Sequence, residues 1–335
     1  MEKRQLGTSS VMVTPMAFGA WAIGGWMWGG AEETDAIKAI QSAYDSGITT
    51  IDTAPVYGFG RSEELVGKAM QGITRDKYEL LTKFGMNWVS EEGEFFFDSV
   101  DNDGKPFKMY KLASKKRIIT ECEDSLRRLK TDYIDLYQIH WPDATTPLEE
   151  TFEALQQLIK DGKIRAAGVC NYNVDLVEEA SKTIQLASNQ VPYSMVLRDI
   201  EKNVIPQAIE KKMSVIAYSP LQRGLLTGKI KPGHKFGEGD TREGNRFYTD
   251  ENIRRANELL EKIKPIAYSY NATLAQLVIN WTINRPGITC ALVGARNAEQ
   301  VADNVKALSF TLSVDELNAI TAAADEFVPA EKSSV

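Results

Sequence analysis

Four side chains that can hold or transfer a proton stand at or just beyond the ends of three apolar segments. Asp52 follows the run ITTI and Tyr57 stands five residues later, while Lys83 ends YELLTK and His140 ends YIDLYQIH. A lysine ammonium near a tyrosine favours the phenolate, and an aspartate beside the lysine keeps it charged. A neutral histidine can hydrogen-bond a substrate oxygen and orient it. Together the four are suited to protonating an oxygen on which negative charge develops.

Each of the four also has an ordinary structural interpretation. An aspartate after a strand commonly caps a turn, a loop tyrosine packs, and a lysine at a strand end reaches water. A lone histidine is more often a satisfied buried group than a catalyst, and this chain has two histidines in 335 residues. What favours chemistry is the convergence of all four at adjacent strand ends. Carbonyl reduction requires this protonation together with a hydride, and since no side chain carries hydride, a nicotinamide cofactor is predicted.

The elements that must position these side chains alternate along the chain. Eight strand–helix units without a linker predict an α/β protein, a single (β/α)8 TIM barrel domain spanning residues 1–335. An open doubly wound sheet is the alternative, but GAWAIGGWMWGG has the wrong glycine spacing for it. Long loops follow the third and seventh strands, and a helix closes the chain. The predicted strands are 13–21, 48–55, 78–85, 133–140, 164–171, 186–190, 214–220 and 288–296, and the predicted helices are 32–46, 62–70, 114–129, 147–162, 173–183, 201–212, helical material in 250–284, 297–307 and 313–327.

Local signals mark where two of these helices begin. Ser62 stands at a predicted N-cap, and Asn297 with Gln300 has the spacing of a capping box. Backbone N–H groups at the start of the second helix suit a phosphate, and Arg296 beside them adds a charged donor. The ordinary alternative for Arg296 is a solvated loop residue.

The composition argues against several other classes of protein. The formal net charge is −7, from 39 Lys and Arg against 46 Asp and Glu, which disfavours nonspecific nucleic-acid binding. Cys122, Cys170 and Cys290 form neither a disulfide framework nor a metal-ligand pattern, so no metal is expected. The N-terminus lacks the apolar region of a signal peptide, and no apolar run approaches the roughly 20 residues of a membrane helix. We therefore expect a cytoplasmic protein without nucleic-acid or membrane partners.

Six segments resemble motifs of the aldo-keto reductase superfamily. IDTAPVYG resembles its Asp-x4-Tyr segment, LLTKFG its lysine strand and YIDLYQIHWPD its histidine strand. GKIRAAGVCNYN, IAYSPLQRGLLTGK and LVGARNAEQVADN resemble its fifth, seventh and eighth strands. The resemblance runs from about residue 3 to residue 327. Within the superfamily, the chain is most similar to bacterial members related to the potassium-channel β subunits.

The resemblance implies an NADPH-dependent oxidoreductase that reduces an aldehyde or ketone to the alcohol. Its substrate would be a small carbonyl compound, sugar-derived or aromatic, and the protein a monomer or weak homo-oligomer. The family implies Tyr57 as the proton donor and Lys83 as the group that lowers the pKa of Tyr57. Asp52 would be the partner of Lys83, and His140 would orient the carbonyl.

The resemblance also implies where NADP(H) binds. Tyr218 would stack on the nicotinamide ring, and Asn171 and Gln190 would hold its carboxamide. The family often has Ser where Cys170 stands, and a thiol is a much weaker hydrogen-bond partner. Arg296, with Gln300 and Asn304, would contact the 2′-phosphate and adenine. The expected coenzyme contacts are Ala20, Trp21, Asp52, Asn171, Gln190, Tyr218, Ser219, Pro220, Leu221, Gln222, Arg223, Lys229, Arg242, Gly294, Ala295, Arg296, Gln300 and Asn304.

The two long loops are expected to complete the site. In the family, the loop 221–249 closes over the pyrophosphate, and we expect His234 within it to face solvent. The loop 85–113 contributes Phe95, Phe96 and Phe97, for which substrate contact and local packing remain equally open. The expected substrate-binding residues form an aromatic rim and are Trp21, Trp26, Trp28, Tyr57 and Trp141.

Two other functions are compatible with a barrel. The first is a cofactor-binding regulatory or partner-binding module of the channel β subunit type, with little turnover. The second is a barrel hydrolase that uses Asp52 and Asp143, but this hypothesis leaves Lys83, Tyr218 and Arg296 unexplained. Oxidation of NADPH in the presence of a simple aromatic aldehyde would distinguish all three functions.

Overall fold

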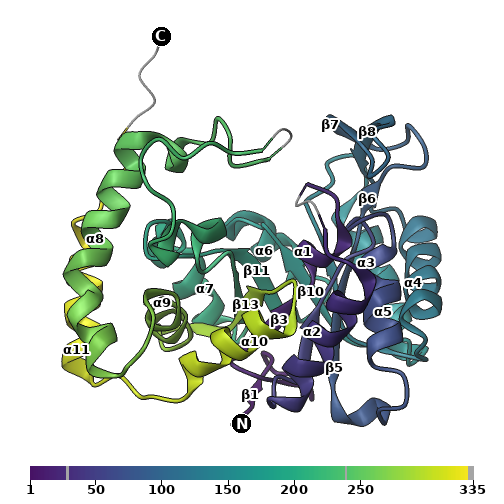
Figure 1. Ribbon diagram of the computed structural model, residues 1–335. Coiled ribbons are helices and arrows are strands. Elements are labelled where there is room, and N and C mark those ends of the chain that lie inside the picture. The colour runs from purple at the N-terminus through teal and green to yellow at the C-terminus, as the bar shows by residue number, and fades with distance from the viewer. Residues whose placement is uncertain (28–29, 238–239, 331–335) are drawn as a thin grey trace.

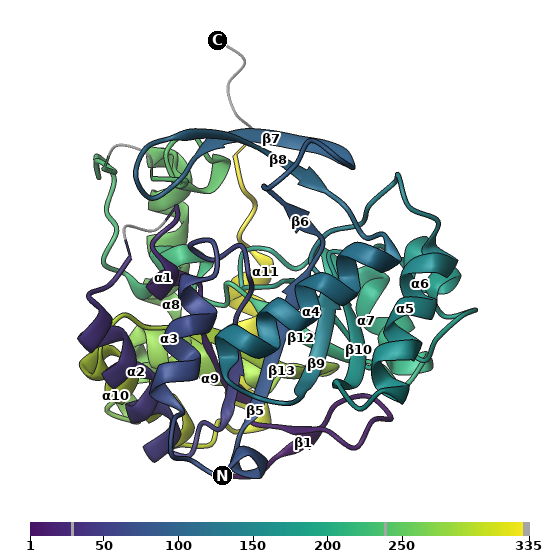
Figure 2. The same ribbon diagram turned by 90° about the vertical axis from the view of Figure 1, so that its right-hand side faces the viewer.

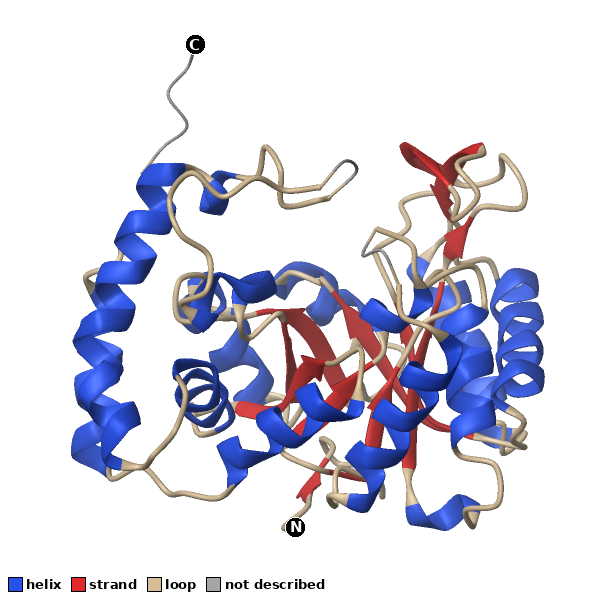
Figure 3. Ribbon diagram, in the orientation of Figure 1, coloured by secondary structure: helices blue, strands red, loops and turns tan. Residues whose placement is uncertain are grey.

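A closed ring of parallel strands forms the centre of the computed structural model, which describes residues 1–27, 30–237 and 240–330 (Figure 1). Within these residues eight strands hydrogen-bond around the ring, which closes where Ala291 pairs with Met16. Figure 3 shows the strands inside a layer of helices. The predicted (β/α)8 barrel is therefore confirmed. In ring order the strands are β3 (Met16–Gly19), β4 (Thr50–Asp52), β5 (Glu79–Phe84), β9 (Ile134–Ile139), β10 (Ile164–Cys170), β11 (Ser188–Pro192), β12 (Ser214–Tyr218) and β13 (Ile288–Gly294).

The helices place their apolar stripes against the outer face of the strands. In α4, for example, Ile118, Cys122 and Leu129 are buried, because their spacing gathers them on one face of the helix. All but the short α1 overlap the predicted helical ranges. The helices are α1 (Trp21–Gly24), α2 (Glu33–Asp45), α3 (Arg61–Ala69), α4 (Lys115–Leu129), α5 (Leu148–Lys160), α6 (Val174–Ala180), α7 (Val204–Glu210), α8 (Asp250–Ser269), α9 (Leu274–Ile283), α10 (Ala298–Val305) and α11 (Val314–Asp325).

The prediction that Ser62 caps a helix is wrong. Helix α3 begins one residue earlier, at Arg61, and Gly60 precedes it with a left-handed φ of 102°. The fully buried Ser62 hydroxyl instead donates to the carbonyl of Ala20 and lies 2.9 Å from the Thr53 hydroxyl. Tertiary contacts therefore decide the role of this serine, which joins the ends of β3 and β4 to the first turn of α3.

A short hairpin closes the amino-terminal end of the barrel. It consists of β1 (Arg4–Gln5) and β2 (Met12–Val13), which pair antiparallel. The hairpin buries Leu6 and Val13 against residues of the barrel interior such as Leu81 and Leu136. Because apolar side chains fill this end, the chemistry of the barrel is confined to the opposite, carboxyl end.

The predicted loop 85–113 contains a small antiparallel sheet, which we call the cap sheet. Its strands are β6 (Met86–Asn87), β7 (Glu94–Val100) and β8 (Pro106–Lys111), in the order β6–β8–β7. Figure 2 shows it standing above the carboxyl end of the barrel. The signal for a hairpin was present in the sequence, because DNDG between FFFDSV and PFKMYK is turn-forming. Asp101 accepts bonds from the backbone of Asp103 and Lys105 in that turn.

The loop after β12 contains the 3₁₀ turns η3 (Gln222–Thr227) and η4 (Arg246–Tyr248). The C-terminal segment holds it from outside, because the buried Asn252 donates to the carbonyls of both Arg246 and Ala330. The 3₁₀ turns η1 (Arg75–Lys77), η2 (Asp199–Lys202) and η5 (Lys306–Leu308) join other elements.

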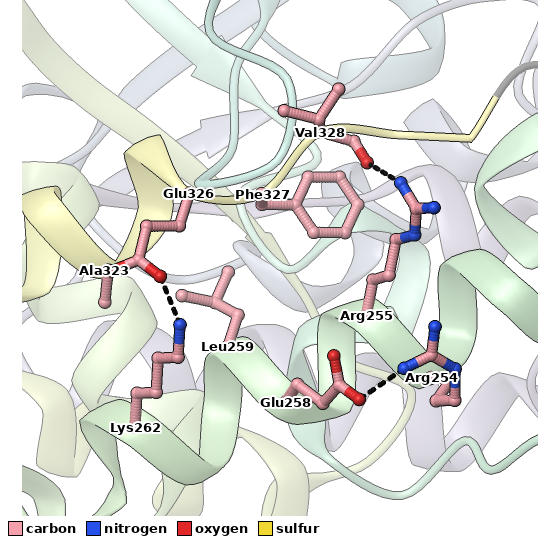
Figure 4. Close-up of a pocket in the computed structure, with 9 residues that line it drawn as sticks. All are labelled: Arg254, Arg255, Glu258, Leu259, Lys262, Ala323, Glu326, Phe327 and Val328. Carbon is pink, nitrogen blue, oxygen red and sulfur yellow. Dashed lines mark hydrogen bonds and ion pairs between the residues drawn. The ribbon is translucent and has the colours of Figure 1, made fainter.

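Helices α8 and α11 meet in a seam with a hollow of about 240 Å³ (Figure 4). Arg254 pairs with Glu258, Lys262 pairs with Glu326, and Arg255 donates to the carbonyl of Val328. The hollow is thus bridged by contacts within the protein. In the part of the chain that the structure describes, no helix is long and apolar enough to cross a membrane.

Candidate active site

A cavity of about 680 Å³ opens at the carboxyl ends of the barrel strands. Lys83 and Gln222, both predicted site residues, are buried beside the cavity and do not line it. Trp28 lies outside the described residues. The predicted residues that line the cavity are Ala20, Trp21, Trp26, Asp52, Tyr57, His140, Trp141, Asn171, Gln190, Tyr218, Ser219, Pro220, Leu221, Arg223, Lys229, Arg242, Gly294, Ala295, Arg296, Gln300 and Asn304.

A buried ion pair lies at the base of the cavity. The Lys83 ammonium donates to Asp52 Oδ1 at 2.6 Å and to the carbonyl of Thr53 at 2.9 Å. Both charged side chains are almost completely buried, because β4 and β5 are neighbours in the ring and point them inward. Burial alone would lower the pKa of Lys83, but Asp52 and the neighbouring Tyr57 outweigh it, so the pKa is raised. Lys83 is therefore a fixed cation.

Tyr57 lies directly above this cation. The Lys83 ammonium is 4.9 Å from the centre of the tyrosine ring. Burial raises the pKa of Tyr57 to about 12, although the Lys83 charge opposes the rise. Lys83 thus lowers the pKa of Tyr57, as expected, but the rise caused by burial is larger, and Asp52 also raises this pKa. At neutral pH the Tyr57 hydroxyl keeps its proton.

Two glycines shape the turn that carries Tyr57. A Cβ on Gly58, whose φ is +70°, would lie 1.9 Å from the carbonyl oxygen of Gly24. A Cβ on Gly24 would lie 2.5 Å from the carbonyl oxygen of Tyr57. The turn and α1 can therefore pack in contact only because both residues lack side chains.

His140 meets Tyr57 edge-on, with ring centres 5.7 Å apart. Its backbone N–H donates to Phe84, which continues the pairing of β9 with β5 past the last strand residue. Burial, assisted by the positive charge of Lys83, holds the pKa of His140 well below its usual range. The imidazole is therefore neutral at physiological pH and has an N–H to donate.

The amides predicted to hold a nicotinamide carboxamide already have protein partners. Gln190 donates to Asp52 Oδ2 at 2.9 Å. Asn171 donates to the carbonyl of His140 at 3.1 Å and accepts from the Tyr218 hydroxyl at 2.9 Å. These bonds fix the Tyr218 ring and the second oxygen of Asp52. The amides thus organise the base of the cavity whether or not they also contact a coenzyme.

The thiol of Cys170 is buried at the same level. It lies 3.8 Å from the Gln138 amide oxygen, within the range of a weak S–H hydrogen bond. Burial raises the pKa of this thiol, so it is not a thiolate at neutral pH. Cys170 therefore supplies shape and no charge to the base of the cavity.

A strained turn follows β12 at the side of the cavity. Ser219, Gln222 and Arg223 have φ values of 58°, 45° and 47°, a conformation that residues other than glycine rarely adopt. The turn is held by bonds from the Tyr248 hydroxyl to the Gln222 carbonyl and from the Ser194 hydroxyl to the Gln222 side chain. Backbone strain of this kind persists where the surroundings overdetermine it and is concentrated at functional sites.

Basic side chains of the loop 221–249 face the cavity. Arg223 donates to the Thr241 hydroxyl and lies over the Trp21 ring at 5.3 Å. Arg242 pairs with Asp240 at 2.6 Å, and this guanidinium lowers the pKa of Asp240. These contacts join described residues of the loop to one another and place Arg223 against Trp21. His234 in the same loop is exposed, as predicted.

The start of α10 forms the far end of the cavity. Asn297 caps the helix, because its side chain accepts from the N–H of Gln300 at 2.9 Å. The Gln300 side chain accepts from the N–H of Arg296, one residue before the position that a capping box requires. Asp303 also lines this end and was not predicted; its carboxylate accepts from Gln276 at 2.8 Å. Only the fold brings it into the cavity.

Apolar residues of the cap sheet and of neighbouring loops complete the wall. Phe96 and Phe97 line the cavity, whereas Phe95 does not. The lining residues Met27, Val56 and Met86 were not predicted, since an isolated apolar residue in a loop has no distinguishing pattern. Figure 2 shows the cap sheet, from which the phenylalanines come, above the barrel.

Asp143 does not take part in the site. Its carboxylate accepts from the Ala113 N–H at 2.8 Å and from Thr145 and Thr146, and it does not line the cavity. A hydrolase that uses Asp52 and Asp143 together is therefore excluded. Among the described residues, no group of three or more His, Cys, Asp or Glu could hold a metal ion.

Comparisons with known proteins agree with this geometry. Aldo-keto reductase YhdN of Bacillus subtilis is 36% identical over 318 residues, 94% of this chain and 91% of the relative. The NADH-specific methylglyoxal reductase of Escherichia coli is also 36% identical, over 93% of this chain and 95% of the relative. The structure of glycerol dehydrogenase AKR11B4 from Gluconobacter oxydans matches with a TM-score of 0.86 and 35% identity, over 99% of this chain and 98% of that one.

The resemblance inferred from the motifs is confirmed at the level of the family, whereas the kinship with channel β subunits stays a prediction. Residues 15–325 match the profile of the Aldo/keto reductase family, which spans every strand of the barrel. The matched residues include the strands that carry the cavity and the cap sheet. The chain therefore belongs to the aldo/keto reductase family.

Proposed function

We propose that this protein is an NADPH-dependent reductase that converts an aldehyde or ketone to the alcohol, with Tyr57 as proton donor. The observation that carries the proposal is the buried Asp52–Lys83 pair beneath Tyr57, with a neutral His140 at its edge. The four residues lie at the base of a cavity of about 680 Å³. A barrel hydrolase that uses Asp52 and Asp143 would leave Lys83 without a role.

The lining of the cavity fits a dinucleotide coenzyme. Arg223, Lys229 and Arg242 supply positive charge along one side, and the N-terminus of α10 with Arg296 supplies it at the far end. The Tyr218 ring, held by Asn171, offers a flat surface near the catalytic group. When bound, the nicotinamide coenzyme would supply a hydride to the carbonyl carbon.

The protein side chains would supply the proton. Tyr57 holds its proton at neutral pH and releases it to the carbonyl oxygen as that oxygen becomes negatively charged. Lys83 stays protonated and stabilises the phenolate that remains, and Asp52 balances the lysine charge before the reaction. A proton from water then restores the hydroxyl of Tyr57.

His140 would bind the same oxygen. Its neutral ring donates one hydrogen bond and so orients the carbonyl toward Tyr57 without competing as an acid. The neutral state follows from burial and from the nearby Lys83 charge, so the orienting bond depends on the same ion pair that supports Tyr57.

Preference for NADPH over NADH rests on Arg296. A guanidinium at a helix N-terminus suits the 2′-phosphate that distinguishes the two coenzymes. The carboxylate of Asp303, on the same helix, lines the same end and repels a phosphate there, so the preference requires the attraction of Arg296 to outweigh this repulsion. The Escherichia coli relative is named as NADH-specific, so membership of the family does not by itself imply NADPH.

The deciding experiment measures NADPH oxidation with an aromatic aldehyde for wild type and Tyr57→Phe. We expect loss of turnover of about a hundredfold or more, the scale of general acid catalysis, with coenzyme binding retained. Tyr268→Phe, at an exposed tyrosine, is the matched control and should behave as wild type. Near wild-type turnover by Tyr57→Phe would disprove the assigned role. Coenzyme binding without turnover by the wild type would favour the partner-binding module.

A further inference from the structure

The cap sheet contains a β-bulge beside the cavity. Phe95 pairs with Tyr110 and Phe97 pairs with Met109, so Phe96 is an extra residue on β7 with no partner on β8. In a regular strand Phe95 and Phe97 would share a face and Phe96 would point away. The bulge breaks this alternation and turns two consecutive rings toward the cavity, which both line, while Phe95 is 50% exposed.

The two rings join an arc of aromatic side chains that begins at the catalytic group. The His140 ring contacts Tyr57, and the next residue, Trp141, lies 5.4 Å from Phe96. Phe96 lies 4.9 Å from Phe97, which in turn stacks on Trp26 at 6.2 Å with ring planes 13° apart. A flat apolar group attached to a carbonyl at Tyr57 would thus meet aromatic faces on several sides.

The cap sheet is held by polar contacts at both ends of β7. The Trp26 indole donates to the carbonyl of Val100 at 3.1 Å, which ties the last residue of β7 to the loop after β3. The Glu94 carboxylate accepts from the N–H of Ala144 at 3.1 Å, which ties the first residue of β7 to the loop after β9. The rings of the cap are therefore positioned before a substrate arrives, which reduces the entropy lost on binding.

Charge is distributed unevenly around the cavity. Among the described lining residues, Arg223, Lys229 and Arg242 belong to the loop 221–249, and Arg296 and Asp303 belong to the coenzyme end. The remaining charged lining residue, Asp52, is paired with Lys83. The Lys111 ammonium lies 5.1 Å from the centre of the Phe96 ring, but it is paired with Glu94 at 2.7 Å and does not line the cavity. Among the described lining residues, the aromatic arc therefore offers no unpaired cation, and a carboxylate or phosphate placed there would lose its hydration without compensation.

We propose that Phe96 and Phe97 are specificity-determining residues that select uncharged carbonyl compounds bearing a planar aromatic group. The inference rests on the proposed reductase function and narrows its substrate class. Aromatic substituents gain from contact with the arc, and small aliphatic carbonyl compounds reach Tyr57 without that contact. Carboxylated or phosphorylated compounds are disfavoured because the cation beside Phe96, Lys111, is already paired with Glu94.

The test compares three aldehydes with NADPH as coenzyme: methyl 4-formylbenzoate, its carboxylate analogue 4-formylbenzoate, and methylglyoxal. The wild type should have a higher kcat/KM with the uncharged aromatic ester than with its carboxylate analogue. Phe96→Leu and Phe97→Leu should each lower kcat/KM for the ester by about tenfold or more, the scale on which apolar pockets discriminate, and change methylglyoxal by less than about threefold. Because each variant is compared with the wild type on each substrate, intrinsic aldehyde reactivity cancels.

Phe95→Leu is the matched control, since it changes the same residue type on the same strand outside the cavity. It should leave kcat/KM unchanged for both the ester and methylglyoxal. Thermal melting of all three variants identifies any general loss of structure. An equal fall in kcat/KM on the ester and on methylglyoxal, or a wild-type preference for the carboxylate over the ester, would overturn the proposal. Absence of turnover with all three aldehydes would instead refute the reductase function itself.

Discussion

At the scale of single residues, burial is what gives the cluster around Tyr57 its chemistry. A lysine, a tyrosine and a histidine in water would have pKa values near 10.4, 10 and 6.5. In this cavity the pKa of Tyr57 rises to about 12 and the pKa of His140 falls well below its usual range. Both shifts have desolvation as their main cause. At physiological pH the Tyr57 hydroxyl therefore keeps its proton, and the His140 imidazole stays neutral.

The role of His140 makes a first prediction. His140→Ala should lower kcat/KM for carbonyl substrates by about a hundredfold, the typical effect of one donor at a developing oxyanion. It should leave coenzyme affinity and the melting temperature nearly unchanged, because the side chain is at the cavity and contributes little core packing. A lowered melting temperature with intact kinetics would instead assign this histidine to the stability of the barrel.

Coenzyme choice makes a second residue-scale prediction. Arg296→Ala should weaken NADPH binding by about ten- to a hundredfold, since a charge-assisted hydrogen bond contributes roughly 1.5–3 kcal/mol. NADH lacks the 2′-phosphate, so its dissociation constant should not change and serves as the internal control. Fluorescence titration of both coenzymes measures the difference. Equal wild-type affinity for NADH and NADPH would remove the case for a 2′-phosphate site.

At the scale of elements, helix α4 and the start of the cap sheet are joined through one buried carboxyl. Glu121 on α4 accepts from the N–H of Gly85, the residue between β5 and β6, and from Arg117 at 2.6 Å. Burial raises the pKa of Glu121 from 4.5 to about 7, although Arg117 opposes the rise. The folded state therefore binds this proton more tightly than the unfolded chain does.

The linkage sets the sign of a pH prediction. Because the folded pKa of Glu121 is raised, its contribution to stability is full below about pH 4.5 and is lost as pH rises through about 7. Glu121→Gln should remove this dependence, so the variant should gain up to about 3 kcal/mol relative to wild type between pH 5 and pH 8. Urea unfolding at both pH values measures it, with the exposed Glu123→Gln on the same helix as control. Identical differences at the two pH values would contradict the assignment.

At the scale of the whole molecule, the barrel separates stability from chemistry at its two ends. The amino end is filled by the β1–β2 hairpin, in which Leu6 is fully buried. Leu6→Ala should cost about 2–5 kcal/mol of unfolding free energy, the range for a buried leucine that leaves a cavity. The carboxyl end carries the site, so kcat/KM below the melting transition should stay at the wild-type value. A kinetic defect in the folded variant would mean that the two ends are coupled.

The order of the elements could be read from the sequence because it depends on local patterns. Strand segments rich in apolar residues alternate with helices whose apolar residues recur every three or four positions, and both patterns survive without knowledge of the fold. The polar residues that end the strands were identifiable for the same reason. Asp52, Tyr57 and His140 line one cavity because parallel strands in a ring bring their carboxyl ends together.

The hydrogen bonds that each of these side chains makes depend on partners far away in the chain. Ser62 reads as a helix cap, yet it joins Ala20 to Thr53 because the fold brings those groups within hydrogen-bond distance. The family resemblance implies that Gln190 holds the nicotinamide carboxamide, and the structure adds that it donates to Asp52, 138 positions away in the chain. Hydrogen bonds between distant segments have no local signature, so no spacing rule could have found them.

The sequence alone thus determined the barrel, the residue types at its carboxyl end and the family, because periodicity and motifs are properties of short segments. Tertiary structure alone decided that the cap sheet has a bulge at Phe96 and that Asp303 lines the coenzyme end. It also decided that the net pKa shift of Tyr57 is upward. Strand register, cavity lining and desolvation all depend on which distant segments exclude water from a group, and that is settled only when the chain has folded.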